Sequence, residues 1–219
     1  MKSLWIITLL ALSLSLHAQQ LYFEGFGTFN STRYDAPSSG DYLNAVKKYL
    51  GYGARVAFGA DHVQVGGEYH ANLNNPSFTG KLGETFEFQE SYYGAFLRTK
   101  ISRYPAMRFG LVLRAGAGVY NTTASRTLGA GSISQDYDAI LGLNGGIGFS
   151  IPIVSHTMLE LGYTYNYLER SGDVFALPDH TASYHAISAG LSLNFVFGER
   201  ARQYQHLREN WKFRNGWRG

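Results

Sequence analysis

Eight stretches of this chain alternate between bulky apolar residues and small or polar residues with a period of two. In VQVGGEYHAN, residues 63–72, Gln64 and Glu68 fall on one side, and Val65 and Tyr69 fall on the other. This period is typical of a β-strand with two distinct faces, because successive side chains of a strand point to opposite sides. The predicted strands cover residues 21–30, 51–60, 63–72, 85–101, 107–120, 139–151, 157–168 and 184–197.

The alternation leaves two kinds of fold open. In a soluble barrel or sandwich the bulky face packs inward, whereas in a membrane barrel it faces lipid. The connections favour the membrane barrel, because long and short connections alternate, as outer loops and periplasmic turns do in outer-membrane barrels. The predicted long connections are residues 31–50, 73–84, 121–138 and 169–183, and the short ones are residues 61–62, 102–106 and 152–156.

The N-terminus indicates export. Residues 1–18, MKSLWIITLLALSLSLHA, hold one early lysine and an apolar run that is too short to cross a bilayer of about 30 Å as a helix. This pattern is typical of a secretory signal peptide, and an N-terminal anchor helix is the alternative. The sequence has no cysteine, so neither a disulfide nor lipidation of a cysteine is available. We expect residues 19–197 to form one exported domain held by hydrogen bonds and burial alone.

Three features point to one class of protein. The predicted signal peptide is followed closely by Gln, in HAQQ; long and short connections alternate; and the last strand reads SAGLSLNF over residues 188–195. That strand is similar to the terminal signal read by the barrel-assembly machinery. With these features the chain resembles the small outer-membrane β-barrel proteins, the eight-stranded OmpA/OmpX-like class, in a form common in Gram-negative bacteria of the Bacteroidetes type.

The resemblance implies an all-β fold, an eight-stranded antiparallel up-and-down transmembrane β-barrel. It places the chain in the outer membrane, with outer-membrane lipid and the barrel-assembly machinery as partners. The implied assembly signal comprises Ser188, Gly190, Leu193, Phe195 and Phe197.

Assigning the small and polar face to the barrel interior places charges of both signs inside. An eight-stranded barrel is just wide enough for its side chains to fill it, and isolated buried ions are costly. Opposite charges should therefore pair, plug the barrel and fix its register, and a narrow gated polar pathway is the alternative. The predicted interior charge network comprises Glu24, Arg55, Glu68, His70, Glu90, Arg98, Lys100, Arg108, Arg114 and Glu160.

Catalysis would need a nucleophile, a base and an orienting group within reach of one another. His185 is predicted near the external rim, with Ser183 and Ser188 close in sequence, but no carboxylate occupies an obvious orienting position. A serine-rich chain contains such pairs by chance, so we expect no enzyme. The sequence holds no metal, nucleotide or cofactor motif, and the glycines of RAGAGVY at 114–120 lie inside a predicted strand.

The first long connection carries a helix signal. In SSGDYLNAVKKYLG, Ser39 is a candidate N-cap, Leu43, Val46 and Leu50 share a helical face, and Gly51 is a candidate stop. The spacing predicts a short helix before the second strand.

Residues 198–219 differ in composition from the predicted barrel. They are strongly basic, whereas residues 19–197 hold slightly more acidic than basic residues. Topology places this tail, which a short helix would suit, in the periplasm. There it would contact the inner leaflet headgroups or a periplasmic protein; a frayed tail is the alternative, and nucleic-acid binding is not expected. The predicted contact residues are Tyr204, Leu207, Arg208, Trp211, Lys212 and Trp217.

These features predict a protein with a structural or interaction role. It would be a closed barrel that presents loops outside and a basic tail in the periplasm, for example as an accessory subunit of an envelope complex. A lipid-modifying enzyme or a narrow channel is the alternative.

Overall fold

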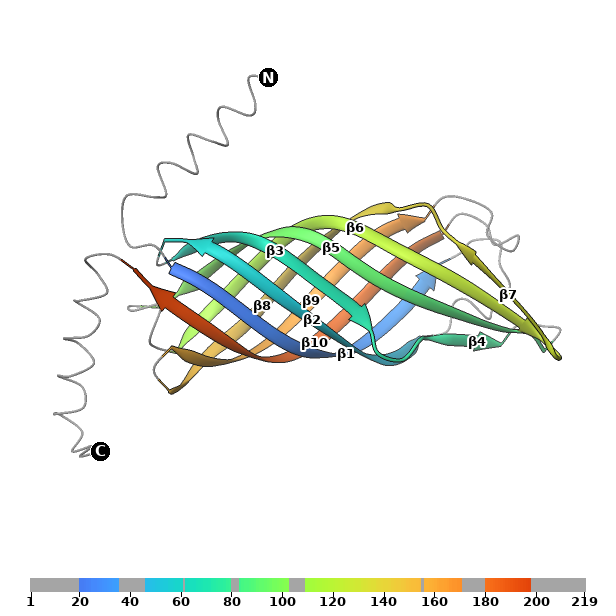
Figure 1. Cartoon of the computed structure of the whole chain (residues 1–219), viewed down its shortest axis with the longest axis horizontal. Helices are drawn as coiled ribbons and strands as arrows, with labels where there is room; N and C mark the ends of the chain where they lie inside the picture. The colour runs from blue at the N-terminus through green and yellow to red at the C-terminus, as the bar shows by residue number, and fades with distance from the viewer. Residues whose placement is uncertain are drawn as a thin grey trace, which may run out of the picture.

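The chain forms a closed antiparallel β-barrel in a computed structural model, which describes residues 20–35, 46–60, 62–79, 83–102, 109–154, 156–170 and 180–197 (Figure 1). Eight long strands close the barrel, because the first pairs with the last and β5 pairs with β6. The predicted fold class is therefore confirmed. The strands are β1 (Gln20–Asp35), β2 (Lys47–Gly59), β3 (Val63–Asn72), β4 (Ser77–Thr79), β5 (Thr85–Ile101), β6 (Gly110–Leu128), β7 (Gly131–Asp136), β8 (Ile140–Val154), β9 (Thr157–Arg170) and β10 (His180–Val196).

The bulky face of the strands points outward. Phe23, Val56, Leu97 and Leu191 each expose at least 40% of their surface, whereas the polar residues that alternate with them are buried inside. This is the sense of a membrane barrel, in which apolar side chains face lipid. No helix in the described part of the chain is long and apolar enough to cross a membrane.

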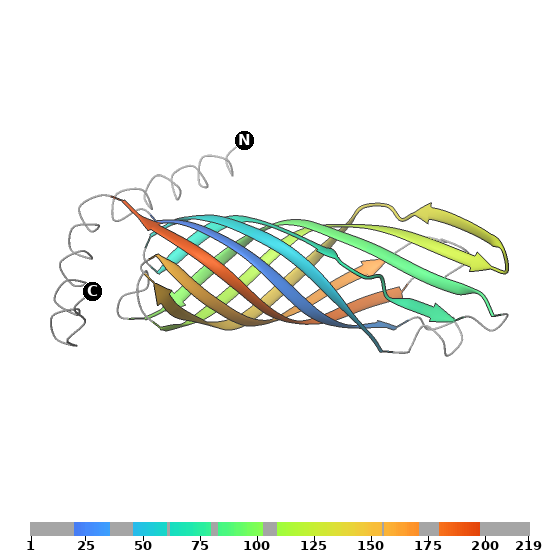
Figure 2. The same ribbon diagram turned by 60° about the horizontal axis from the view of Figure 1, so that its bottom comes forward.

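Two predicted long connections contain further β-structure. Residues 73–84 include β4, and residues 121–138 hold the end of β6 and the whole of β7. These strands and the adjoining end of β5 form a four-stranded extension, which we call the outer sheet (Figure 2). It reaches past the ends of the other strands. The sequence predicts loops over these mostly polar residues, because an exposed β-sheet above a membrane is polar too.

The helix predicted in the first long connection is wrong where the structure describes it. Lys47–Leu50 belong to β2 and pair with Phe29–Thr32 of β1. Tyr49 points into the barrel, where Thr32 Oγ1 donates a hydrogen bond of 2.8 Å to its hydroxyl. The pairing satisfies the backbone of these residues and buries a tyrosine, which outweighs a weak local helix preference. Residues 39–45 lie outside the described residues.

The other end of the barrel has short turns. β8 continues through Pro152 to Val154, beyond its predicted end, and its pairing with β9 has an irregularity between these two residues. His156 follows with a φ of 77°, the left-handed conformation of a tight turn. Its Nδ1 lies 3.0 Å from the carbonyl oxygen of Asn194, so the ring ties the turn to β10.

Candidate functional site

A chain of ion pairs crosses the interior of the barrel. Arg55 of β2 lies between two carboxylates: its Nη1 is 2.9 Å from Glu24 of β1, and its Nε pairs with Glu68 of β3. The other oxygen of Glu68 lies 3.4 Å from Nδ1 of His70, two residues along the same strand. One arginine thus joins three neighbouring strands from the inside.

The chain continues across the lumen to the far wall. Nη2 of Arg114, on β6, lies 3.5 Å from Glu24 and 2.9 Å from Glu160 of β9. Nη2 of Arg98, on β5, lies 2.7 Å from the other oxygen of Glu160. Glu24 and Glu160 each therefore lie between two guanidinium groups. We call this set the ion network, and it comprises Arg98, Glu160, Arg114, Glu24, Arg55, Glu68 and His70.

The ion network is buried and balanced. None of its arginine or glutamate side chains exposes more than 8% of its surface, and three of each sign are present. Burial of ions is expensive unless each is paired, and removal of one partner leaves a charge without compensation. The arrangement therefore fixes which strands lie opposite one another.

Aromatic rings support the arginines. The guanidinium carbon of Arg55 lies 3.9 Å from the ring centre of Phe26, and that of Arg98 lies 4.3 Å from the ring centre of Tyr22. These are cation–π distances, which suit a guanidinium better than an ammonium group. The Tyr22 hydroxyl also donates a 2.5 Å hydrogen bond to Glu24.

The remaining predicted interior charges lie apart from the ion network. Glu90 accepts a 2.5 Å hydrogen bond from the Tyr184 hydroxyl, nearer the outer end. Lys100 donates to Ser150 Oγ, at 3.0 Å, near the short-turn end. Arg108 lies outside the described residues. All the other predicted members belong to the ion network itself.

The lumen also holds buried polar residues that the predicted charge network does not name, although alternation places Gln64 on the inward face. Gln64 donates to Gln20 at 3.0 Å and accepts from Arg98 at 2.9 Å, so both glutamines extend the ion network toward the short-turn end. Tyr22 and Tyr184 were also missed, because tyrosine was counted with the bulky outward face. The signal was present, since each shares its parity with an inward charged or polar residue of its own strand.

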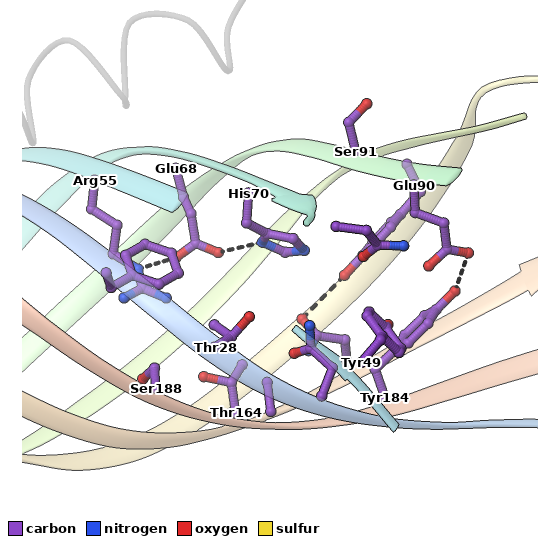
Figure 3. Close-up of a pocket in the computed structure, with 16 residues that line it drawn as sticks. Thr28, Tyr49, Arg55, Glu68, His70, Glu90, Ser91, Thr164, Tyr184 and Ser188 are labelled. Carbon is purple, nitrogen blue, oxygen red and sulfur yellow. Dashed lines mark hydrogen bonds and ion pairs between the residues drawn. The ribbon is translucent and has the colours of Figure 1, made fainter. Parts of the chain in front are cut away.

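A small cavity lies between the ion network and the outer end of the barrel. Figure 3 shows Arg55, Glu68 and His70 at one side of the cavity, and Glu90 with Tyr184 at the other. Its volume is about 30 Å³. This is room for about two water molecules, since roughly 10–15 Å³ suffices for one, and far too little for an organic ligand.

An aromatic cluster fills the lumen beyond the cavity. Tyr120 lies at its centre, with its ring centre 4.7 Å from that of Tyr92 and 6.1 Å from that of Tyr184. Among the described residues, ions and rings thus fill the barrel along most of its length. The buried members are Tyr49, Phe78, Phe86, Phe88, Tyr92, Tyr120, Ala124, Tyr137, Leu168, Ala182 and Tyr184.

This packing predicts that the purified protein forms no pore of porin size. Single-channel recordings in planar lipid bilayers should show no large, steady conductance, because buried ion pairs and stacked rings occupy the lumen. A porin recorded in the same bilayers serves as the positive control. A large and stable open level in repeated preparations would contradict the closed lumen.

The structure separates the serine and histidine residues considered for catalysis. His185 is exposed on the outside of β10, and its Nδ1 makes a 2.6 Å hydrogen bond with the hydroxyl of Tyr163. Ser183 shares this outward face, but Ser188 points into the lumen and is buried. Ser188 is therefore ruled out as a partner of His185. No group of three or more His, Asp or Glu side chains in the described residues is placed to hold a metal ion.

The residues of the implied assembly signal lie on the last strand, β10, and directly after it. Ser188 and Gly190 point inward from β10, whereas Leu193, Phe195 and Phe197 are exposed on the outside. Their role in assembly stays a prediction. The predicted signal peptide, residues 1–18, and the predicted tail, residues 198–219, lie outside the described residues, and so do all predicted tail contacts.

No protein-family model and no curated protein sequence matches the chain. Solved structures do match. Neisserial surface protein A gives a TM-score of 0.59 at 15% identity, covering 80% of this chain and 97% of that one. OprG from Pseudomonas aeruginosa gives 0.49 at 16% identity, covering 82% and 96%. Ail of Yersinia pestis gives 0.48 at 15% identity, covering 81% and 100%. At such identities the likeness concerns the fold alone.

Proposed function

Since the chain has the fold of the small eight-stranded outer-membrane β-barrels, the OmpA/OmpX-like class, we propose that it is an outer-membrane protein with a structural or interaction role. In this role the barrel anchors the outer sheet in the membrane and presents it to partners outside the cell. The observation that carries the proposal is the outer sheet, which exposes an ordered polar face beyond the membrane-spanning part.

That face consists of polar side chains in register. Ser125 and Ser134 lie 2.8 Å apart across β6 and β7, and Thr123 donates a 2.6 Å hydrogen bond to Asp136. Such cross-strand pairs stabilise a sheet that has no lipid to face. The rows of the face are Thr79, Thr85, Thr127 and Ser132; then Ser77, Glu87, Ser125 and Ser134; then Gln89, Thr123 and Asp136.

On β4 and β5 the opposite face of the outer sheet anchors it to the barrel, whereas β7 is exposed on both faces. Phe78, Phe86 and Phe88 are buried in the aromatic cluster, so the extension has its own apolar support. A rigid sheet loses less conformational entropy on binding than a flexible loop does, which favours a role in recognition. The same aromatic residues close the lumen, which supports an interaction role over transport.

The N-terminal and C-terminal segments complete the proposal. Residues 1–18 would direct export as a signal peptide, and the basic residues 198–219 would lie in the periplasm. The start of β1 and the end of β10 pair with each other at the short-turn end of the barrel. This supports the proposal that a tail which leaves β10 starts on the periplasmic side. Docking of this tail to a periplasmic partner would make the protein an accessory subunit of an envelope complex.

Crosslinking in intact cells tests the proposal. The Tyr137 N–H donates a 2.9 Å hydrogen bond to the Thr122 carbonyl, so residues 123–136 can be replaced by a two-residue Asn-Gly turn without moving the barrel. We expect this trimmed variant to lose the external crosslinked partners of the full chain. A variant that ends at residue 197 should lose only periplasmic partners.

Controls separate misfolding from lost binding. Heat-modifiable migration on gels and outer-membrane fractionation should be the same for all three proteins. The proposal fails if the trimmed variant and the full chain recover identical partners, or if the full chain recovers none above cells that lack it.

A further inference from the structure

Basic residues gather on one side of the barrel at its outer rim. Lys48, Ser31, His185 and Tyr165 lie side by side in register across β2, β1, β10 and β9. All four point outward, and only Ser31 is half-buried. Arg33 is exposed on β1, two residues beyond Ser31 toward the outer end of the strand.

An apolar row lies directly beneath these residues. Leu50, Phe29, Ile187 and Tyr163 are in register on the same four strands, and each exposes more than 40% of its surface. The outward side chains therefore change from an apolar row to the row of Lys48 and His185 within two residues along each strand. In a membrane barrel this step marks the depth at which acyl chains give way to headgroups.

The side chains of this step can bind a phosphate. The 2.6 Å hydrogen bond to Tyr163 occupies Nδ1 of His185, so Nε2 is the imidazole nitrogen left to donate to a phosphate oxygen. The Tyr165 ring centre lies 5.3 Å from that of the imidazole. Lys48 adds an ammonium group in the same row. A cation, an imidazole and phenol hydroxyls are donors suited to phosphate oxygens.

Negative charges nearby lie further from the membrane. Glu169 accepts a 2.8 Å hydrogen bond from Tyr167 and pairs with Thr181, one pleat repeat beyond the row that holds Arg33. The opposite side of the rim differs in sign, since the outer sheet exposes Glu87 and Asp136 there. The basic character thus belongs to one side of the barrel.

We propose that Lys48 and His185, with Tyr165 beside the imidazole, bind the phosphate of a lipid headgroup in the outer leaflet, while Leu50, Phe29 and Ile187 contact its acyl chains. This inference rests on the proposed location of the protein in the outer membrane. The bound lipid would hold the barrel at a fixed depth and rotation, with the outer sheet on the side away from it.

Lipid binding by the full chain tests this proposal. The purified protein in detergent micelles is titrated with diphosphorylated lipid A and followed by native mass spectrometry. We expect Lys48→Ser combined with His185→Ala to weaken binding on the order of tenfold. A lysine near a charged lipid surface contributes about a factor of five, and the loss of the imidazole removes a further hydrogen-bond donor. Arg126→Ser, which removes one positive charge from the outer sheet, is the control and should bind as the unaltered chain does.

Each outcome decides the matter. Lipid A without phosphates should bind at least tenfold more weakly, and inorganic phosphate should not compete at millimolar concentration. Equal binding by the double variant, or by the dephosphorylated lipid, would overturn the proposal, and competition by inorganic phosphate would show a free-anion site instead. Fractionation of cells tests the outer-membrane location separately, so its failure is distinguishable from a failure of lipid binding.

Discussion

Replacing Glu160 by alanine should lower the free energy of unfolding of the barrel by about 3–5 kcal/mol. Glu160 lies 2.7 Å from Arg98 and 2.9 Å from Arg114, and all three side chains are buried. The substitution leaves two guanidinium groups in the lumen without their shared partner. Unfolding by guanidinium chloride in phospholipid vesicles, followed by far-UV circular dichroism, measures the loss.

Two further variants give this result its meaning. Glu160→Gln keeps the volume and one hydrogen-bond acceptor but removes the charge, so its loss should be smaller than that of the alanine variant. Glu87→Ala removes a carboxylate from the exposed face of the outer sheet and should change stability by less than about 0.5 kcal/mol. If Glu160→Ala is as stable as Glu87→Ala, the ion network does not hold the barrel together.

A second large effect is expected at Gly118, which points into the lumen on β6. A Cβ atom there would overlap the backbone of Tyr93 and Gly94 on β5, and would lie 2.7 Å from the Tyr92 ring. Backbone atoms of a paired strand cannot move aside cheaply. Gly118→Ala should therefore cost about 1–3 kcal/mol, as overpacking of a filled core does. The same vesicle experiment measures this cost.

Gly145 provides the matched control for this prediction. It lies on the outward face of β8, and a Cβ atom there would meet nothing within 4 Å. Gly145→Ala should leave stability unchanged or raise it slightly, because alanine restricts the unfolded chain more than glycine does. Equal losses at both positions would mean that strand propensity, rather than space in the lumen, explains the effect.

The sequence predicts this fold well because two constraints act on every strand. Alternation distinguishes the two faces of each strand. The lumen is so narrow that its side chains fill it, so inward positions take small residues or polar residues that pair with one another. The limits of β3 and β5 are therefore predicted to the residue. The ends of β6 and β10 are not, because outside the membrane both faces become polar and alternation loses its contrast.

The charge pairs of the lumen could be predicted only in part. The alternation of inward and outward residues places Arg98 and Glu160 inside. It does not give the position of either residue along the barrel axis. They are separated by 62 residues, and their contact depends on the stagger of all the strands between them. The same limit applies to Ser188 and His185, which are close in sequence but lie on opposite sides of the wall.

The pairing of β1 with β10 also sets when this chain can become a barrel. Gln20 pairs with Val196 and Asp35 with Thr181, so nearly the whole domain separates the partners of this seam. Contacts of such long range slow folding, because a large loop must close before any of them forms. Until β10 arrives, β1 has an unpaired edge that other chains can join. The species most prone to aggregate is therefore the incomplete domain, which exists from the synthesis of its first strand to the arrival of its last.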